Sequence, residues 1–381
     1  MNLIAVSKLA CGQRYSKPVY IDGESLLVEA EIPLQKRDLD LLASLGVTHV
    51  QTDGEPLSPD GSPLKESDNT ESQLSSSLEA GAVSKLLGNL IKQLDGILRE
   101  TVIKKENKEK KHSVRQLWAI SSVLLKIVKD ERASCLGFVL SGAYNTYHIA
   151  KSAINTAILS IVMAREMGMA LERIPEVAAG ALLHDIGMLR LPPEITGKAG
   201  ELSAEEAALI CSHTTLSYNI ITRELAYSPS VGTIALQHHE RWDGTGYPQR
   251  LVGSAIDAGA RIVCIADAFE AMICEKPYRN PMIGYIAMKN IVSENAAHFA
   301  PATLKVFLRV IGMYPIGSGV TLSDGRIARV IDVHPDVPLR PVVQIIAELG
   351  AKRVKEAEKI DLLNQKQLFI TQALDISSFE N

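Results

Sequence analysis

The spacing of apolar residues along the chain changes twice. In residues 1–53, short β-prone runs at 18–21 and 25–28 flank a turn at Asp22-Gly23, which is the pattern of a hairpin. A helix over 36–45 that closes at Gly46 follows, and then a strand at about 47–51. This pattern predicts a small N-terminal α+β domain.

Apolar residues become scarce in residues 54–77, which are rich in Ser, Pro, Gly, Asp and Glu. Such a segment cannot bury enough apolar surface to offset the entropy cost of ordering it, so we expect a flexible linker. Helical spacing returns in residues 78–140, which are predicted to form connecting helices, with one apolar stripe inside 113–129. That stripe can pack within one chain or pair two copies, so a homodimer is one of two alternatives.

Helices are predicted to dominate residues 141–312. Ser203 and Glu206 form a capping box that opens a helix running to His213, and Ser228-Pro229 supplies a cap and a first-turn proline to another helix. Residues 313–381 change to a β pattern, with a hairpin around 323–325 and a strand at 342–346. The predicted fold is mainly α, with a helical core, a small N-terminal α+β domain and a small C-terminal β appendage.

Composition narrows the function classes. No apolar run of the 381 residues approaches the about 18 needed to span a bilayer. The net charge of -4 gives no general attraction to a nucleic acid polymer or an anionic membrane. The first residues lack a secretory signal pattern, and the five cysteines form no Cys-x-x-Cys pair. We therefore expect a cytoplasmic protein with no membrane span.

Candidate chemistry begins with His184-Asp185, at the end of the apolar helix predicted over 177–183. Neighbours on a helix point about 100° apart, so the pair can hold one metal from two directions, or the carboxylate can bridge two metals. The alternative is structural, because a buried histidine commonly bonds a carboxylate.

Four further residues weaken the structural alternative. His213, His238, His239 and Asp267 all lie in predicted helical segments otherwise rich in small and apolar residues. Burying so many ionisable groups without partners would be costly, whereas shared divalent cations would satisfy them together. The absence of cysteine from the set favours iron or manganese over a structural zinc.

Three motifs in this region resemble the HD-GYP family. They are His184-Asp185-Ile186-Gly187, the loop from His238 through Gly246-Tyr247-Pro248, and Lys276-Pro277-Tyr278-Arg279, and the resemblance covers about residues 140–345. It implies an HD-type helical bundle and a bacterial phosphodiesterase that hydrolyses cyclic di-GMP to pGpG or GMP with two or three divalent metals. Residues 1–53 also resemble a small domain often found ahead of HD-GYP domains, through which protein partners would bind.

The resemblance also implies roles for individual residues. Asp185 would be catalytic, because it would both bridge the metals and orient the attacking water. Gly246, Tyr247 and Pro248 would border the nucleotide pocket, and Lys276 and Arg279 would bind the substrate phosphates. The implied metal ligands are His184, Asp185, His213, His238, His239 and Asp267.

Lys276 stands where the family usually has arginine, and two further departures from the family pattern matter more. Lys151 stands where the family has a histidine ligand, although His148 lies one helical turn earlier, and Met188 stands where the family has a lysine. One hypothesis is that the Lys151 ammonium replaces a lost positive charge. The alternatives to an active enzyme are a catalytically degenerate receptor or scaffold that binds cyclic di-GMP or a protein, and a wider HD-type phosphohydrolase.

Overall fold

A computed structural model of the 381-residue chain describes most of it. The described residues are 2–6, 9, 12–21, 26–36, 38–39, 42, 47, 49–57, 80–103, 107–141, 149–198, 200–274, 282, 284–294, 296–348, 352–353 and 358–374.

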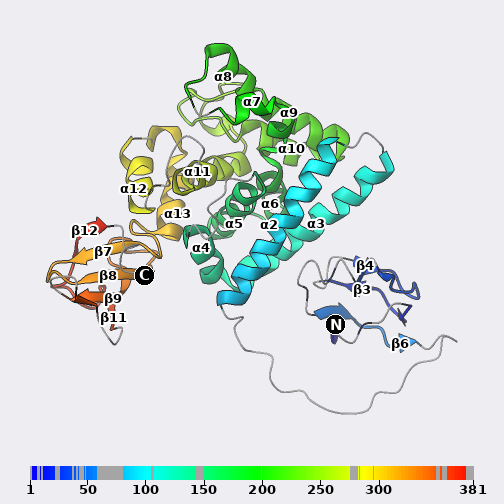
Figure 1. The fold of residues 1–381 in the computed structure, drawn as a ribbon, viewed down its shortest axis with the longest axis horizontal. Coiled ribbons are helices and arrows are strands. Elements are labelled where there is room, and N and C mark those ends of the chain that lie inside the picture. Colours follow the sequence, from blue (N-terminus) through cyan, green and yellow to red (C-terminus); the bar gives the residue numbers. More distant parts are fainter. Residues whose placement is uncertain are drawn as a thin grey trace, which may run out of the picture.

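A helical bundle forms the centre of the molecule (Figure 1). Its middle helix is α5 (Ile149–Glu166), which is buried at every position from Ala150 to Ala164. A helix that is apolar or small on all sides must be buried on all sides, and α5 packs against α6 (Ile174–Leu183) and α11 (Ala258–Ile273). These contacts bring residues far apart in the sequence together at one end of α6.

Three connecting helices pack on this centre: α2 (Ala80–Ile103), α3 (Asn107–Asp130) and α4 (Arg132–Ser141). The predicted apolar stripe of α3 is buried in the core of the single chain, as Ile120 and Leu124 show. The stripe is therefore covered without a second copy.

Both predicted helix caps of the core are present. The Ser203 hydroxyl accepts the Glu206 N–H in a capping box that opens α8 (Ala204–Cys211), and Ser228 caps α10 (Pro229–Gln237). The expectation that one helix continues to His213 is wrong. The Ser212 hydroxyl donates to the Leu209 carbonyl at 2.6 Å, a local bond that competes with the helix, and His213 begins α9 (His213–Asn219).

The other short elements of the bundle connect these helices. They are η2 (Ile186–Arg190), α7 (Pro193–Thr196), η3 (Ile220–Glu224), η4 (Gly253–Ala255), α12 (Gly284–Lys289), η5 (Asn290–Glu294), η6 (Ala296–His298) and α13 (Pro301–Ile311). Within the described ranges, no helix has both the length and the apolar character needed to cross a membrane.

The C-terminal part is a six-stranded antiparallel sheet, larger than the predicted hairpin and single strand. The hairpin is present, because β7 (Gly319–Leu322) pairs with β8 (Ile327–Asp332), and β9 (Val342–Glu348) continues the sheet. The missed strands are short, and β12 has exposed positions where a strand signal would need apolar ones. They are β10 (Lys352–Arg353), β11 (Lys359–Asp361) and β12 (Ile370–Leu374).

The N-terminal part holds six short strands: β1 (Asn2–Ala5), β2 (Arg14–Tyr15), β3 (Val19–Tyr20), β4 (Leu26–Val28), β5 (His49–Thr52) and β6 (Pro56–Leu57). Four of them form a sheet in the order β1-β5-β3-β4, and β2 and β6 form a separate pair. The predicted turn at Asp22-Gly23, most of the predicted helix and residues 58–77 lie outside the described residues. The described strands extend past residue 53, because β6 follows the four-stranded sheet in the sequence and pairs with β2.

Candidate metal centre

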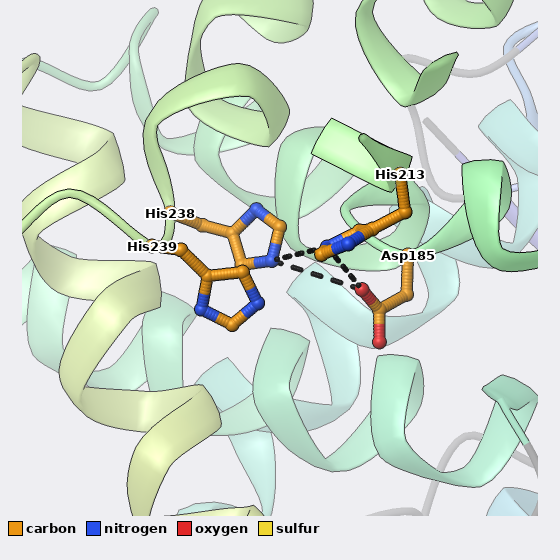
Figure 2. A group of neighbouring side chains, drawn as sticks. All are labelled: Asp185, His213, His238 and His239. Atoms are coloured by element: carbon orange, nitrogen blue, oxygen red, sulfur yellow. Dashed lines mark hydrogen bonds and ion pairs between the residues drawn. The ribbon is translucent and has the colours of Figure 1, made fainter. Parts of the chain in front are cut away.

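Helix ends place most of the predicted ligands. His184 is the C-cap of α6, His213 begins α9, and His238 is the C-cap of α10 with His239 in the turn beyond it. Only Asp267 lies within a helix, on α11. The three histidine-bearing helix ends meet, and Figure 2 shows the imidazoles of His213, His238 and His239 converging beside Asp185.

Backbone carbonyls orient three of the imidazoles. Each Nδ1 lies 2.7 Å from the carbonyl oxygen three residues earlier, so Nδ1 carries the proton and donates it. Carbonyls in the last turn of a helix lack intrahelical partners and are therefore free to accept. When such a ring is neutral, its lone pair is on Nε2, which faces the other ligands. The pairs are His184 with Ala181, His213 with Ile210, and His238 with Ala235.

The side chains form two groups, in each of which the ligand atoms lie within 4.8 Å of one another. One group is Asp185, His213, His238 and His239, and the other is His184, His238 and Asp267. His238 belongs to both groups.

Asp185 lies between the two groups. Its Oδ1 is 3.2 Å from His213 Nε2 and 3.7 Å from His238 Nε2, while its Oδ2 is 3.6 Å from His184 Nε2. A carboxylate that offers one oxygen to each of two ligand groups has the arrangement needed to bridge two metals.

The donor set fits divalent metals. His184 is fully buried, and its Nε2 lies 3.4 Å from Asp267 Oδ1 and 3.6 Å from Asp185 Oδ2 without a hydrogen bond of good geometry to any described residue. A buried polar atom without a partner costs free energy, and a metal ion would satisfy it. Imidazole nitrogens and carboxylate oxygens without cysteine match metals such as iron and manganese better than a structural zinc.

The charges of the site favour the metal-binding form of three ligands, Asp185, His238 and His239. Burial opposes ionisation of Asp185, but the neighbouring imidazoles outweigh burial and hold its pKa well below its usual value. Burial lowers the pKa of His239 to about 4 and the pKa of His238 well below its usual value. At neutral pH the structure therefore offers an ionised carboxylate and two neutral imidazoles. Burial opposes protonation of His184 and His213 as well, but neighbouring carboxylates outweigh it and raise the pKa of His184 to about 9 and the pKa of His213 above its usual value. These two imidazoles would therefore release a proton when a metal binds.

The loop of Gly246, Tyr247 and Pro248 packs directly on the group that contains His239. A Cβ added to Gly246 would lie 2.3 Å from the Arg241 nitrogen and 2.5 Å from the His239 oxygen, so only glycine fits there. The Tyr247 N–H donates to the same His239 oxygen at 3.2 Å, and burial raises the pKa of the Tyr247 hydroxyl, which therefore stays protonated. The exposed Pro248 follows. The loop thus borders the metal ligands as expected for a pocket wall.

Glu240 holds the far side of the loop, a role that the sequence did not reveal. Its side chain is 1% exposed and accepts the N–H of Gln249 at 2.6 Å and the N–H of Leu251 at 2.9 Å. The only indication of this role in the sequence was the position of Glu240 directly after His238 and His239.

A second buried carboxylate, Glu270, was also missed. It lies one helical turn after Asp267 on α11 and accepts hydrogen bonds from Ser152 at 2.8 Å, from Asn155 at 3.3 Å and from Cys274 at 2.9 Å. Glu270 therefore ties α11 to the first two turns of α5. The signal in the sequence was a second carboxylate, one turn after Asp267, in a mostly apolar helix.

The two departures from the family pattern fall in different places. Lys151 is 6% exposed in the first turn of α5, next to Ser152, while Met188 is half-buried in η2. Three other predicted residues, His148, Lys276 and Arg279, lie outside the described residues.

Known proteins resemble two parts of the chain. Residues 142–303 match the family model of the HD domain, and residues 319–381 match a KOW domain associated with HD domains, which the sequence reasoning did not predict. The HD match therefore ends before residue 345, where the predicted resemblance ended.

Several curated relatives are bacterial phosphodiesterases. One from Thermotoga maritima, named a cyclic di-GMP phosphodiesterase, is 39% identical over 153 residues, which are 40% of this chain and 42% of that protein. Another so named, from Pseudomonas aeruginosa, is 30% identical over 204 residues, 54% of this chain and 49% of that protein. The chain spans about half the length of these relatives or less.

Among solved structures, an HDG"Y"P protein from Bdellovibrio bacteriovorus matches with a TM-score of 0.38 and 17% identity, over 80% of this chain and 97% of that one. Residues 142–303 are thus similar to the HD domain and to these phosphodiesterases, and the Gly-Tyr-Pro loop lies beside the histidines of the same region.

Proposed function

We propose that the chain is a metal-dependent phosphodiesterase that hydrolyses cyclic di-GMP to pGpG or GMP in bacterial second-messenger signalling. The observation that carries this proposal is the pair of ligand groups that share His238 and have Asp185 between them. The names of the curated relatives support the substrate.

Six side chains would hold two or three divalent ions, with iron or manganese favoured by the nitrogen and oxygen donors. They are His184, Asp185, His213, His238, His239 and Asp267. When bound, such ions supply Lewis acidity toward a phosphate oxygen and lower the pKa of water.

The remaining steps fall to the chain's own groups. Asp185 stays ionised because its pKa is held low, and it can accept a hydrogen bond from the attacking water and so orient it. Tyr247, with its neighbours Gly246 and Pro248, would form the wall against which a guanine lies. Lys276 and Arg279 would bind the phosphates of the substrate.

The names of the relatives contain two different substrates, cyclic di-GMP and 3'3'-cGAMP. One relative from Vibrio cholerae, 32% identical over 147 residues, is named a 3'3'-cGAMP-specific phosphodiesterase. The ratio of kcat/KM for cyclic di-GMP to that for 3'3'-cGAMP tests the substrate. A ratio above one supports the proposal, and a ratio below one replaces cyclic di-GMP with the mixed dinucleotide.

A receptor that binds cyclic di-GMP without turnover is the second candidate. The buried Lys151, in the slot of a family histidine ligand, is the observation in its favour. Calorimetry with cyclic di-GMP on metal-loaded wild-type protein, combined with chromatography of the same sample, separates the two. Binding with intact nucleotide afterwards identifies a receptor, and conversion to pGpG or GMP identifies the enzyme.

Two further proposals concern the setting of the enzyme. We propose a cytoplasmic location, in keeping with the absence of a disulfide among the cysteines of the described residues, namely Cys135, Cys211, Cys264 and Cys274. Protein partners on the N-terminal sheet and a homodimer stay predictions.

A further inference from the structure

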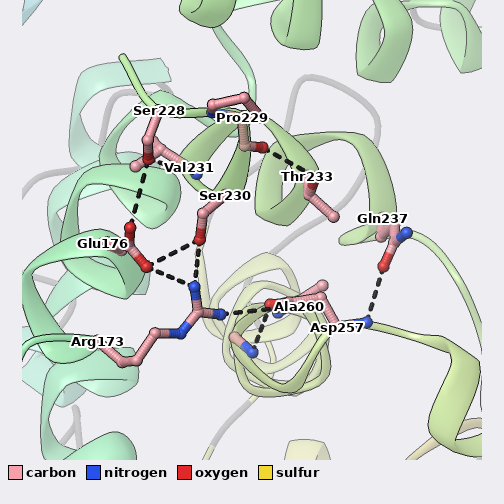
Figure 3. Close-up of polar contacts among 11 residues, drawn as sticks. Arg173, Glu176, Ser228, Pro229, Ser230, Val231, Thr233, Gln237, Asp257 and Ala260 are labelled. Atoms are coloured by element: carbon pink, nitrogen blue, oxygen red, sulfur yellow. Dashed lines mark hydrogen bonds and ion pairs between the residues drawn. The ribbon is translucent and has the colours of Figure 1, made fainter. Parts of the chain in front are cut away.

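Arg173 lies where the N-terminal ends of three helices meet (Figure 3). It is the N-cap of α6, and its Nη1 contacts Glu176 in the first turn of the same helix. The same Nη1 donates to the Ser230 hydroxyl at the start of α10, and Nη2 lies 3.0 Å from Asp257 Oδ2, the N-cap of α11. One guanidinium therefore joins α6, α10 and α11.

These are the helices that carry ligands at or toward their other ends. α6 leads to His184, α10 leads to His238, and α11 carries Asp267. Because a helix is nearly rigid along its axis, a shift of one helix start relative to another moves the ligand by a similar distance. The relative positions of the three starts therefore set the spacing within the group formed by His184, His238 and Asp267.

Asp257 extends this link toward the histidine pair. Its Oδ1 caps α11 by accepting the Gly259 N–H at 2.8 Å, while its backbone N–H donates to Gln237 Oε1 at 2.8 Å. Gln237 directly precedes His238. A chain of contacts thus runs from Arg173 through Asp257 and Gln237 to a ligand shared by both groups.

The charges around Arg173 suit a planar, forked donor. The guanidinium faces the carboxylates of Glu176 and Asp257, and Ser230 donates its proton to Glu176 at 2.8 Å. The side chains of Arg173 and Asp257 are 31% and 24% exposed, so solvent screens their attraction. What the fork supplies is geometry, because its two nitrogens fix the directions of two neighbours at once.

We propose that Arg173 is a positioning residue for the metal centre. It contacts none of the predicted ligands and acts through Ser230 and Asp257, which hold the starts of α10 and α11 in register with α6. The inference rests on the proposed function, since it assumes that the two ligand groups bind metal. Metal sites tolerate displacements of about 0.5 Å, so a small loss of register is enough to weaken binding.

The test is a titration of the metal-free full chain with Mn²⁺, followed by electron paramagnetic resonance. For Arg173→Ala we expect a Kd for Mn²⁺ about tenfold higher than in the wild type, by analogy with the loss of outer-shell supports of metal ligands. We also expect a weaker signal from spin-coupled ion pairs, because the two groups no longer hold their spacing. Arg173→Lys keeps the charge but has one nitrogen, and should restore part of the affinity.

Arg309→Ala is the matched control. Arg309 is 39% exposed and also pairs with two carboxylates, Glu166 and Asp336, but it lies on α13, which carries none of the predicted ligands. If Arg173→Ala does not fold, Asp257→Asn replaces it. That variant keeps the Oδ1 cap of α11 and removes only the oxygen that pairs with Arg173.

Three results overturn the inference. A Kd for Mn²⁺ within twofold of the wild type in folded Arg173→Ala or Asp257→Asn excludes positioning while leaving the proposed function intact. An equal loss in Arg309→Ala shows that reduced stability explains the effect. A wild-type chain that binds no Mn²⁺ overturns the metal centre itself, and the positioning role with it.

Discussion

The ring of Tyr247 lies against the ring of His239, with centroids 4.8 Å apart and planes tilted by 33°. The residue that would contact the nucleotide is thus in contact with a predicted metal ligand. Figure 2 shows how His239 also faces His238 in the same group. A substitution of Tyr247 should therefore change nucleotide binding without changing metal binding only if the new side chain is similar in shape.

We predict that Tyr247→Phe keeps KM for cyclic di-GMP within about twofold, while Tyr247→Ala raises it about tenfold, because stacking on a base is worth about 1–3 kcal/mol. Steady-state hydrolysis with Mn²⁺ measures both. Equal KM values for Tyr247→Ala and the wild type would mean that the loop does not contact the base.

Removal of His184 should cost one metal. His184→Ala leaves Asp185, His213, His238 and His239 in place but breaks the group that contains Asp267, so we expect metal per chain to fall by about one ion. Elemental analysis after gel filtration gives the number. His298→Ala is the control, since His298 lies 3.8 Å from Asp243 outside both groups. An unchanged metal content in His184→Ala would contradict the second group.

The close approach at Gly246 predicts a loss of stability. Gly246→Ala places a Cβ 2.3 Å from the Arg241 nitrogen, and overpacking of this kind lowers the free energy of unfolding by about 1–3 kcal/mol. Gly96→Ala on α2 has no atom within 4 Å of its added Cβ and should raise stability by about 1 kcal/mol. Urea unfolding of both variants checks the pair, and a stable Gly246→Ala would contradict the described loop.

Lys151 stands where the HD-GYP family has a histidine, and we predict that it contributes to the binding of cyclic di-GMP. If the Lys151 ammonium replaces a lost positive charge, Lys151→Met should weaken cyclic di-GMP binding about tenfold, the effect of losing about 1.4 kcal/mol of charge interaction. Calorimetry on metal-loaded protein gives the Kd, with Lys198→Met on the exposed Lys198–Glu206 pair as control. Unchanged metal content and unchanged Kd would exclude compensation.

Structural features that depend on neighbouring residues could be predicted from the sequence. The caps at Ser203 and Ser228 and the hairpin around Gly325 follow from neighbouring residues, and the structure has all three. The six predicted ligands are indeed brought together. His184 was predicted at a helix end, as the structure has it, whereas His238 and His239 were predicted within a helix. In the structure His238 is the C-cap of α10 and His239 lies in the turn beyond it.

Contacts between segments that are distant in the sequence could not be predicted from it. Arg173, Ser230 and Asp257 look like ordinary surface residues in the sequence, and only the packing of α6, α10 and α11 brings them together. Glu270 meets Ser152 across two helices in the same way. Strand β11 was missed because its three residues carry too little apolar pattern to signal an element.

The most direct test of the account is turnover of cyclic di-GMP by the full chain, purified without oxygen or chelator and supplied with Fe²⁺ or Mn²⁺. A metal-dependent phosphodiesterase should hydrolyse it to pGpG or GMP, and hydrolysis should stop with chelator and in Asp185→Ala but continue in Asp336→Ala, whose side chain is 85% exposed. No hydrolysis by folded, metal-loaded wild-type protein would contradict it.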